Sequence, residues 1–598
     1  MIPENNTNLQ HTDLQHQMID TIIIGGGITG CYLLNRLLTV KPSNSILWHS
    51  QQKEEINGRE FGVTPVVLLE SSPRLGGRVE TIKFTDTDGT HVQYEAGGAR
   101  FSDKHKRLVK LLKELDLYNS RIPISSDVMH VMLPEASGQK GLSALFTKYP
   151  EIMKIINHIR KYIKTNTIPQ SVISMHTLYS FTKDVMNDTS LAKYMLEFYE
   201  YYSELATLNM VRALEVFVTE FNNRVQYYVL NPGYESIVTK LMTGISQKEY
   251  CKLNTLVTQI KEVIDSVTRV KHFEVITSDL SGNVTTYYAQ NLVICIPVDA
   301  LKKINMQLLG SEKGRENIKA ICNKIKPEPL YRIYARFPPN QLPITLPKVA
   351  TNLPIKYIIP MDPKNGVVML SYTDGIYAKK LNRIYQRDLQ NDTDKLTTLL
   401  TDNINKLLPY VTEDKEQASL TTPLWIKHHY WASGAGYWLP GNIPDLEDVT
   451  HPIPGSRLYL AGEQVSNHQA WVEGCLETAD MVLKQLGAMN TTRPKKNSKH
   501  LITYRTKKNK KVTVNGGGAK TYTKDEVAKH NTPDNAWTII NKKVYNITKW
   551  IDKHPGGNVI LQGIGKDATS MFNHKGGGIG HSASAHKILE KYYIGNLG

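Results

Sequence analysis

The first periodic segment of the chain lies between residues 19 and 70. Residues 22–24 are three isoleucines, a short apolar run that predicts a buried strand. Glycines follow at once, and leucines at positions 33, 34, 37 and 38 then recur with the spacing of one helix face. A second apolar run, Val66 to Leu69, ends in Glu70. The segment therefore predicts a strand–helix–strand unit with a longer crossover than usual.

Apolar and aromatic residues keep helical or strand-like spacing through the rest of the body. Residues 103–116 predict an amphipathic helix, and residues 142–220 are rich in aromatic and aliphatic side chains at helical spacing. Strand-like runs follow at 225–230, 268–276, 285–297, 330–337 and 366–372. Helices and strands thus mix throughout residues 1–488.

The periodic pattern stops between residues 489 and 520, where Asn, Thr, Lys and Pro accompany a Gly-Gly-Gly run. Residues 491–520 hold 10 Lys and Arg and no Asp or Glu, so they carry most of the net charge of +16. Residues 521–598 hold 10 basic and 6 acidic residues, which leaves a nearly neutral body of +2. We interpret the basic segment as a solvated linker; contact with nucleic acid or an anionic membrane is the less favoured interpretation.

Length and composition exclude several classes of protein. The chain of 598 residues has room for about three to five structural units, and its 40% apolar and 21% charged residues exclude a disordered or fibrous protein. Five cysteines stand singly, without zinc-like spacing, which favours a reducing compartment. The sequence shows no membrane-spanning run and no signal peptide in the polar residues 1–18. We expect a soluble intracellular protein, cytoplasmic by default, without a transmembrane segment.

The glycine-rich turn after the first strand has a chemical meaning of its own. Gly25-Gly26-Gly27-Ile28-Thr29-Gly30 has the G-x-G-x-x-G pattern between a predicted strand and a predicted helix. Gly25 permits the tight turn, Gly27 lets a pyrophosphate approach the backbone, and Gly30 allows the helix to pack closely on the strand. Glu70 is placed to accept a hydrogen bond from a ribose hydroxyl. The pattern predicts a dinucleotide-binding site.

Further motifs follow in order along residues 19–486. They are Glu70-Ser-Ser-Pro-Arg-Leu-Gly-Gly-Arg78, Tyr94-Glu95-Ala-Gly-Gly-Ala-Arg100-Phe101, Asn231-Pro-Gly-Tyr234, Val293-Ile-Cys-Ile-Pro297, Leu460-Ala-Gly-Glu463 and Trp471-Val-Glu-Gly474. In this combination the sequence resembles the flavin-dependent amine oxidase family, which includes monoamine, polyamine and L-amino acid oxidases. The resemblance implies an α/β Rossmann-like FAD-binding domain with an α+β substrate domain, of the amine oxidase and p-hydroxybenzoate hydroxylase type.

The same resemblance implies which residues surround FAD: Gly25, Gly27, Gly30, Glu70, Arg78, Gly98, Val257, Gly462 and Glu463. Glycine amides and a guanidinium suit phosphates, carboxylates suit ribose or ribityl hydroxyls, and Val257 would offer its backbone to adenine. Monoamine oxidases attach the flavin to the Cys of a Gly-Gly-Cys-Tyr motif, whereas this sequence reads Gly434-Ala435-Gly436-Tyr437. We therefore expect non-covalent FAD.

Four residues are the candidate catalytic residues by resemblance. Arg100 matches the arginine with which L-amino acid oxidases bind the substrate carboxylate, and such a pair would orient the α-carbon. Trp471, with Tyr437 or its neighbour Trp438, would form an aromatic cage for a neutral amine. Arg332 stands where the family usually has a lysine that holds a water near flavin N5, so oxygen is not assumed to be the electron acceptor.

The tail carries a second set of motifs: Ile551-Asp-Lys-His554-Pro-Gly-Gly557, Gly565-Lys-Asp-Ala-Thr569 and Gly580-His581-Ser582. Residues 521–598 resemble the cytochrome b5 haem domain, a small α+β domain. The resemblance implies a b-type haem whose iron has His554 and His581 as axial ligands. His574 is the competitor for the second position, and no C-x-x-C-H motif for covalent attachment occurs.

These patterns divide the chain into a polar extension (1–18), a flavin amine oxidase (19–488), a basic linker (489–520) and a haem domain (521–598). Within the oxidase we expect FAD-binding segments at about 19–125, 245–305 and 445–488, and a substrate domain at about 126–244 and 306–444.

The predicted function is FAD-dependent oxidative deamination of an L-amino acid or related amine, by hydride transfer to flavin N5. The fused haem, a redox partner protein or O₂ would then take up the electrons. Two alternatives stay open. One is a monoamine or polyamine oxidase that uses O₂ and produces H₂O₂, and the other is a flavin-fold scaffold without catalysis.

Overall fold

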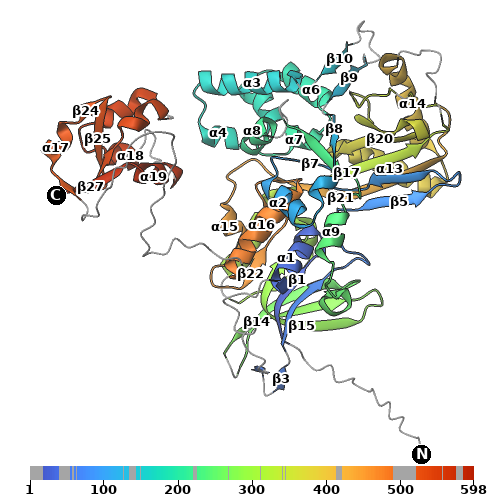
Figure 1. Cartoon of the computed structure of the whole chain (residues 1–598), viewed down its shortest axis with the longest axis horizontal. Helices are drawn as coiled ribbons and strands as arrows, with labels where there is room; N and C mark the ends of the chain where they lie inside the picture. The colour runs from blue at the N-terminus through green and yellow to red at the C-terminus, as the bar shows by residue number, and fades with distance from the viewer. Residues whose placement is uncertain are drawn as a thin grey trace, which may run out of the picture. The chain divides into compact units, whose positions relative to one another are not determined.

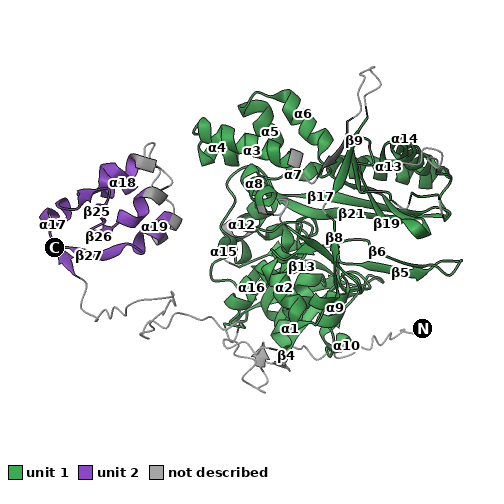
Figure 2. Cartoon of the chain, turned by 45° about the horizontal axis from the view of Figure 1, so that its top comes forward, with its two compact units in different colours: residues 1–494 green, residues 495–598 purple. Residues whose placement is uncertain are grey.

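The computed structural model describes most of the chain, in two compact units that comprise residues 1–494 and 495–598 (Figure 2). The described residues are 18–39, 54–56, 59–61, 63–125, 127–133, 143–147, 150–219, 225–266, 269–309, 312–339, 341–343, 345–412, 420–488, 520–554, 557–573 and 583–598. The basic segment up to residue 519 lies outside them, as do His574 and His581. No helix in the described ranges is both long and apolar enough to cross a membrane.

Unit 1 begins with the predicted strand–helix–strand unit. β1 (Met18–Ile24) is buried along its whole length and leads through the glycines into α1 (Ile28–Thr39). β4 (Val63–Leu69) and β15 (Val284–Ile294) flank β1 in parallel. The continuous apolar run of β1 fits this central position, since a strand covered on both faces has no solvent side to keep polar.

These strands belong to an eight-stranded sheet. Its order is β12 (Cys251–Lys252), β4, β1, β15, β14 (Lys271–Ser278), β13 (Leu256–Ile264) and β16 (Asn305–Gln307), with β22 (Leu458–Leu460) beside β15. β1, β4, β15 and β22 run in parallel, so their carboxyl ends meet at one edge. This is the edge at which open α/β sheets bind ligands.

A second sheet of unit 1 has seven strands. Its order is β10 (Ser143–Thr147), β9 (Val128–Met132), β18 (Val349–Thr351), β19 (Tyr357–Asp362), β20 (Val367–Asp374), β17 (Ile325–Arg336) and β21 (Trp425–Trp438). Side chains of β17 alternate between its faces. Tyr331, Ile333 and Ala335 pack in a core with α13 (Gly375–Asn391) and α14 (Lys395–Val411). The intervening side chains, Arg332 among them, therefore face away from that core.

Short helices cover the other face of this sheet. They include α3 (Pro150–Thr165), α4 (Gln170–Ser174), α6 (Thr189–Phe198), α7 (Tyr202–Ala206) and α8 (Met210–Thr219). Figure 1 shows α3, α4, α6 and α8 gathered together, away from α13 and α14. Phe181, Phe198 and Phe217 of this layer share one core with Tyr357 and Tyr437 of the sheet. The aromatic content of residues 142–220 thus forms an interior between helices and sheet.

The structure departs from the predicted elements in several places. The segment predicted to be helical from residue 142 begins with a strand, β10. Two long strands, β13 and β21, lie outside the predicted runs. β21 extends over 14 residues and pairs with β17 along most of its length.

Unit 2 is a small sheet with short helices. The strand order is β23 (Thr521–Tyr522), β27 (Tyr593–Leu597), β26 (Lys543–Asn546), β25 (Asn535–Ile540) and β24 (Asn531–Thr532). The helical elements are α17 (Lys524–Ala528), η6 (Thr548–Lys553), η7 (Gly557–Gly563), α18 (Thr569–Asn573) and α19 (Ala583–Glu590). The unit has its own apolar core around Ala536, Ile540 and Tyr545.

Candidate active site

A cavity of about 570 Å³ lies at the carboxyl edge of the parallel strands and extends to the second sheet. Gly25, Glu70, Cys295 and Ala461 line it, and each is the first residue after one of the parallel strands. Leu330 of β17 and residues 431–435 of β21 line it from the other sheet. Residues of both large sheets of unit 1 thus form the cavity wall.

Two glycines of the turn have different roles: Gly27 leaves space for a ligand, and Gly30 lets helix α1 pack against the turn. Gly25 has φ +107°, a conformation that glycine adopts without strain. A Cβ on Gly30 would collide with the carbonyl oxygen of Gly25, so α1 packs directly on the turn. A Cβ on Gly27 would meet nothing within 4 Å, and Gly27 lines the cavity. The turn therefore forms an open cradle at Gly27, which fits a bulky anionic group such as the pyrophosphate of FAD.

Glu70 lies beside this cradle, at the end of β4. Its Oε2 accepts a hydrogen bond from the Gly26 amide at 2.6 Å, and its Oε1 accepts one from the Ser72 amide at 2.8 Å. Oε1 also accepts from the Ser71 hydroxyl at 3.4 Å, whereas Oε2 keeps a second lone pair. Glu70 is therefore fixed by the backbone and still able to accept a ribose hydroxyl of FAD.

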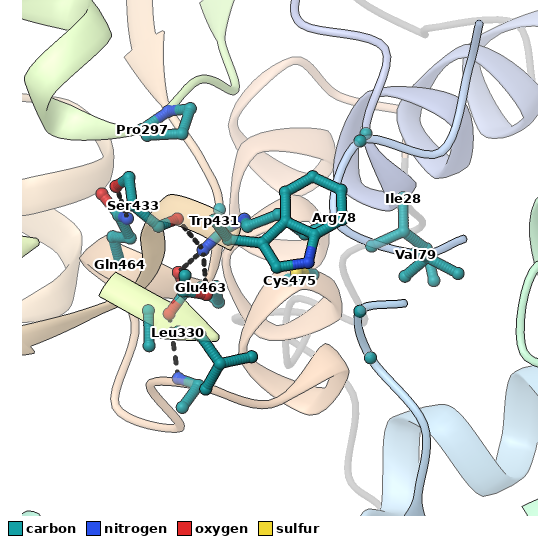
Figure 3. Close-up of a pocket in the computed structure, with 18 of the residues that line it drawn as sticks. Ile28, Arg78, Val79, Pro297, Leu330, Trp431, Ser433, Glu463, Gln464 and Cys475 are labelled. Carbon is teal, nitrogen blue, oxygen red and sulfur yellow. Dashed lines mark hydrogen bonds and ion pairs between the residues drawn. The ribbon is translucent and has the colours of Figure 1, made fainter. Parts of the chain in front are cut away.

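Arg78 and Glu463 form an ion pair in the wall of the cavity (Figure 3). Arg78 Nη1 donates to Glu463 Oε1 at 2.6 Å and to the carbonyl oxygen of Gly434 at 2.9 Å. Glu463 Oε2 accepts from the Ala470 amide at 2.9 Å. The pair thus joins the segment after β4 to β21 and to the start of α16 (Val472–Gln485).

The other residues expected around FAD divide into two groups. Gly98 and Gly462 line the cavity. Gly30 and Val257 do not: Gly30 packs α1 on the turn, and Val257 lies in β13, two residues after Thr255, whose amide donates to the Glu70 carbonyl oxygen. At Gly436, a Cβ would lie 2.6 Å from Cγ of Gln464. This crowding leaves no space for a cysteine side chain without a shift, in keeping with the expected non-covalent FAD.

Arg100 enters the cavity among aromatic rings. Its guanidinium carbon lies 5.2 Å from the ring centre of Tyr227 and 5.7 Å from those of Tyr201 and Trp471. Arg100 Nη2 donates to the Tyr201 hydroxyl at 3.0 Å. Arginine stacked on rings keeps its in-plane N–H groups available to a carboxylate.

Arg332 reaches the same cavity from β17 and is 6% exposed. Its Nη1 donates to the Glu95 carbonyl oxygen at 2.9 Å, and its guanidinium carbon lies 4.7 Å from the ring centre of Tyr372. Its Nε is buried and has no hydrogen-bond partner in the described parts of the chain. A buried donor of this kind calls for an acceptor, either water or a ligand.

The sequence left open whether Tyr437 or Trp438 faces the cavity beside Trp471. Tyr437 and Trp471 line the cavity. Trp438 does not, because adjacent residues of a strand face opposite ways; it packs in the core beneath the first sheet, and its Nε1 donates to the Ser466 carbonyl oxygen at 2.9 Å. At this end of β21, Tyr437 and not Trp438 is therefore the aromatic side chain that lines the cavity.

Three acidic residues of the cavity wall were not predicted from the sequence: Asp299, Glu204 and Asp374. Glu204 of α7 and Asp374 at the end of β20 line the cavity. The Tyr199 hydroxyl donates to Glu204 at 2.8 Å, and the amides of Tyr202 and Ser203 donate to Asp374 at 2.8 and 2.9 Å. Burial raises the pKa of Glu204 to about 8 and that of Asp374 to about 6. The available signal was an acidic residue within the aromatic stretch Tyr199–Ala206.

In unit 2, His554 follows η6 and is partly buried. Val559 in η7 and Met571 in α18 are 51% and 46% exposed, although both are large apolar side chains. Apolar side chains left open on the segments after His554 fit the porphyrin of a b-type haem, which would cover them. The expected second ligand, His581, and its competitor His574 lie outside the described residues.

Comparison with known proteins agrees with both units. The family model described as "Flavin containing amine oxidoreductase" matches residues 59–482, and "Cytochrome b5-like Heme/Steroid binding domain" matches residues 523–598. Cytochrome b5 of Candida tropicalis is 58% identical over 77 residues, which cover 13% of this chain and 57% of that protein. Cytochrome b5 of Oryza sativa subsp. japonica is 47% identical over 79 residues, covering 13% and 55%. The chain thus spans little more than half the length of these curated relatives.

Solved structures resemble unit 1 in fold. Wild-type putrescine oxidase bound to putrescine superposes with a TM-score of 0.56 at 11% identity, over 79% of this chain and 99% of that chain. Cyclohexylamine oxidase from Brevibacterium oxydans IH-35A gives a TM-score of 0.53 at 12% identity, over 78% and 98%. At these identities the likeness shows a shared fold.

Proposed function

Because the chain belongs to the flavin containing amine oxidoreductases, with FAD and a b-type haem as its cofactors, we propose that it deaminates an L-amino acid oxidatively. The observation that carries this proposal is the position of Arg100. It is a guanidinium inside the cavity, bordered by three aromatic rings and steadied by the Tyr201 hydroxyl. A cation in this setting suits a substrate that has a carboxylate.

The residues of the chain would act mainly by binding and orientation. FAD, when bound, supplies the acceptor for a hydride from the α-carbon. Arg100 holds the substrate carboxylate, which fixes the rotation of the α-carbon in the cavity. The resulting imine then reacts with water to give a 2-oxo acid and ammonia.

Tyr437 and Trp471 would border the amine and keep water from it. Both line the cavity, and Trp471 is itself supported by His105 and Tyr227, whose ring centres lie 4.6 and 5.9 Å away. The orphaned Arg332 Nε offers a hydrogen bond to a water or to a ligand oxygen. Arg332 thus takes a positioning role in this proposal.

Substitution of Arg100 tests the carboxylate role. Arg100→Ala should raise KM for L-amino acids by about 100-fold or more, because a charge-assisted bidentate pair is lost, and should change KM for primary amines only slightly. Arg121→Ala is the matched control: Arg121 also stacks on tyrosines, 3.9 Å from the ring centre of Tyr118, but it does not line the cavity. Equal effects of Arg100→Ala on both substrate classes would reject the proposal.

We further propose that the haem of unit 2 accepts electrons that derive from the substrate. The support for this proposal is that a single chain contains both redox domains. Adding substrate to the full chain without oxygen should produce the reduced-haem absorption bands together with loss of flavin colour. A haem that stays ferric while the flavin bleaches would reject this step.

A further inference from the structure

The cavity of unit 1 contains more charge than an amino acid with a neutral side chain requires. Besides Arg74, Arg78, Glu70, Asp299 and Glu463, the cavity wall has two guanidinium groups, Arg100 and Arg332, and two carboxyl groups, Glu204 and Asp374. The two carboxyl groups come from different elements, α7 and β20, and Glu204 and Asp374 are only 8% and 6% exposed. Burial of acidic side chains is costly unless a partner compensates it.

Neither carboxyl group forms an ion pair in the described parts of the chain; Arg100 acts on Glu204, and Lys356 on Asp374, only at longer range. Glu204 accepts from a tyrosine hydroxyl, and Asp374 accepts from two backbone amides, all of them neutral donors. Glu328 makes the comparison clear. It is equally buried and lies close in the fold, but Lys326 forms an ion pair with it at 2.5 Å, and it does not line the cavity. Of these three buried acids, only the two that line the cavity lack an ion pair in the described residues.

Arg332 gives an independent sign that the cavity is shaped for a charged ligand. Its side chain is buried and lines the cavity, and its Nε has no acceptor in the described residues. The cavity thus presents an unused donor as well as carboxylates without an ion pair. A ligand that carries both charges would satisfy both sets of groups.

We propose that the substrate is a basic L-amino acid, whose side-chain cation binds at Glu204 and Asp374 while Arg100 binds its carboxylate. The inference rests on the proposed function and adds the class of side chain. Lysine, ornithine and arginine have a flexible aliphatic stem, for which Leu330 and Tyr372 provide apolar surface in the same cavity. A cation beside the two carboxylates would also offset the repulsion between them.

The test compares lysine with norleucine, which has the same carbon chain without the ε-ammonium group. Anaerobic flavin bleaching by the full-length holoenzyme gives kcat/KM for each. We expect kcat/KM to be at least about 100-fold higher for lysine, because norleucine would leave the buried carboxylates unpaired. Comparable values for the two amino acids would overturn the inference and leave the proposed function standing.

Glu204→Gln then identifies the residue responsible. Glutamine keeps the shape of the side chain and its hydrogen bond with Tyr199. The substitution should lower kcat/KM for lysine by about 100-fold and change kcat/KM for norleucine by no more than about threefold. Glu328→Gln, the matched control, should leave the ratio of the two substrates unchanged. If Glu204→Gln lowered kcat/KM equally for both substrates, the inference would be wrong. If the variant did not fold, the comparison of lysine with norleucine in the wild-type protein would decide.

Further substrates separate failure of the inference from failure of the proposed function. Putrescine has two amines and no carboxylate. If it were oxidised and lysine were not, both the role of Arg100 and the basic amino acid would be rejected. If no L-amino acid bleached the flavin, the proposed function would fall and this inference with it. If leucine and methionine were the best substrates, the inference alone would fail.

Discussion

Glu204 is the residue whose titration bears most directly on the proposed substrate. Burial raises the pKa of its carboxyl group to about 8, and hydrogen bonding from Tyr199 opposes this rise. Asp374 has a pKa of about 6 and is therefore largely ionised at neutral pH. A cation is attracted only by the ionised carboxylate, so ionisation of Glu204 above pH 8 strengthens its binding.

We therefore expect the preference for lysine over norleucine to increase with pH. The ratio of their kcat/KM values should rise by about tenfold between pH 7 and pH 9, as Glu204 loses its proton. The α-amines of the two substrates titrate alike in the wild type and in Glu204→Gln, so comparison with this variant removes their contribution. The charged and titratable groups that act on Glu204 are Asp374, Arg100, Glu200, Tyr199 and Tyr437.

Glu204→Gln provides the control for this pH profile. Because glutamine does not titrate, the ratio of lysine to norleucine should become flat over the same range. A wild-type ratio that is independent of pH, or one that falls as the pH rises, would contradict the assignment of Glu204 as the group that binds the cation.

Sequence reasoning located part of the cavity and missed part of it, for a physical reason. Motifs with local geometry, such as the glycine turn and the arginine after Gly98, could be recognised from neighbouring residues. Glu204 and Asp374 are 170 positions apart and carry no local motif. Their significance comes from tertiary packing that buries both beside one cavity, and a single sequence does not report that.

At the scale of elements, one glycine of the turn is needed for folding and another for cofactor binding. Gly30 has no room for a Cβ because the Gly25 carbonyl oxygen lies in its path, whereas a Cβ at Gly27 would extend into the open cavity. Gly27→Ala should leave the apoprotein folded and weaken FAD binding by about tenfold or more, since an inserted methyl group at an occupied contact costs about 1–3 kcal/mol.

Gly30→Ala is the matched variant for this prediction. It should push α1 away from β1, lower the melting temperature of the apoprotein and reduce soluble yield, in addition to weakening FAD. Fluorescence titration of apoprotein with FAD and thermal unfolding without FAD measure the two effects. If Gly27→Ala destabilised the apoprotein as much as Gly30→Ala, the open cradle would be the wrong description of the turn.

The elements that sequence patterns predicted are those with simple apolar periodicity. β1, α1 and β4 have it, and α2 (Lys106–Glu114) falls within the predicted helix 103–116. β21 does not: its sequence Trp-Ile-Lys-His-His-Tyr-Trp-Ala-Ser-Gly-Ala-Gly-Tyr-Trp mixes polar, aromatic and small residues. Its first part is only partly buried and its last four residues are buried, so no single period of two describes it.

At the scale of the whole molecule, two units with separate cores imply that each cofactor can be removed alone. His554→Ala should abolish the haem Soret band, because it removes an axial ligand of the iron. The flavin spectrum and anaerobic flavin bleaching by substrate should stay unchanged, since unit 1 has its own cores. Loss of flavin reduction in this variant would show that the units depend on one another for folding.

The second haem ligand is open to the same test. Alanine variants of His581 and His574 should differ, with loss of the Soret band in His581→Ala and its retention in His574→Ala. The motif spacing of the tail carries this prediction, because the distance from His581 to Ile594-Gly595 resembles that of the cytochrome b5 domain. The opposite pattern would transfer the ligand role to His574.

Transfer of electrons within one chain also predicts how the rate of haem reduction depends on concentration. The composition of the basic segment predicts a solvated linker. A flexible linker of about 30 residues has a mean reach of roughly 30 Å. A linker of that length keeps the haem domain at an effective concentration of the order of 1 mM near the oxidase. At 1 μM protein, encounters within the chain would then exceed those between chains by about 1,000-fold. The anaerobic stopped-flow rate of haem reduction should therefore stay constant from about 0.5 to 20 μM protein, whereas a rate that rises in proportion to concentration would assign the haem to electron transfer between molecules.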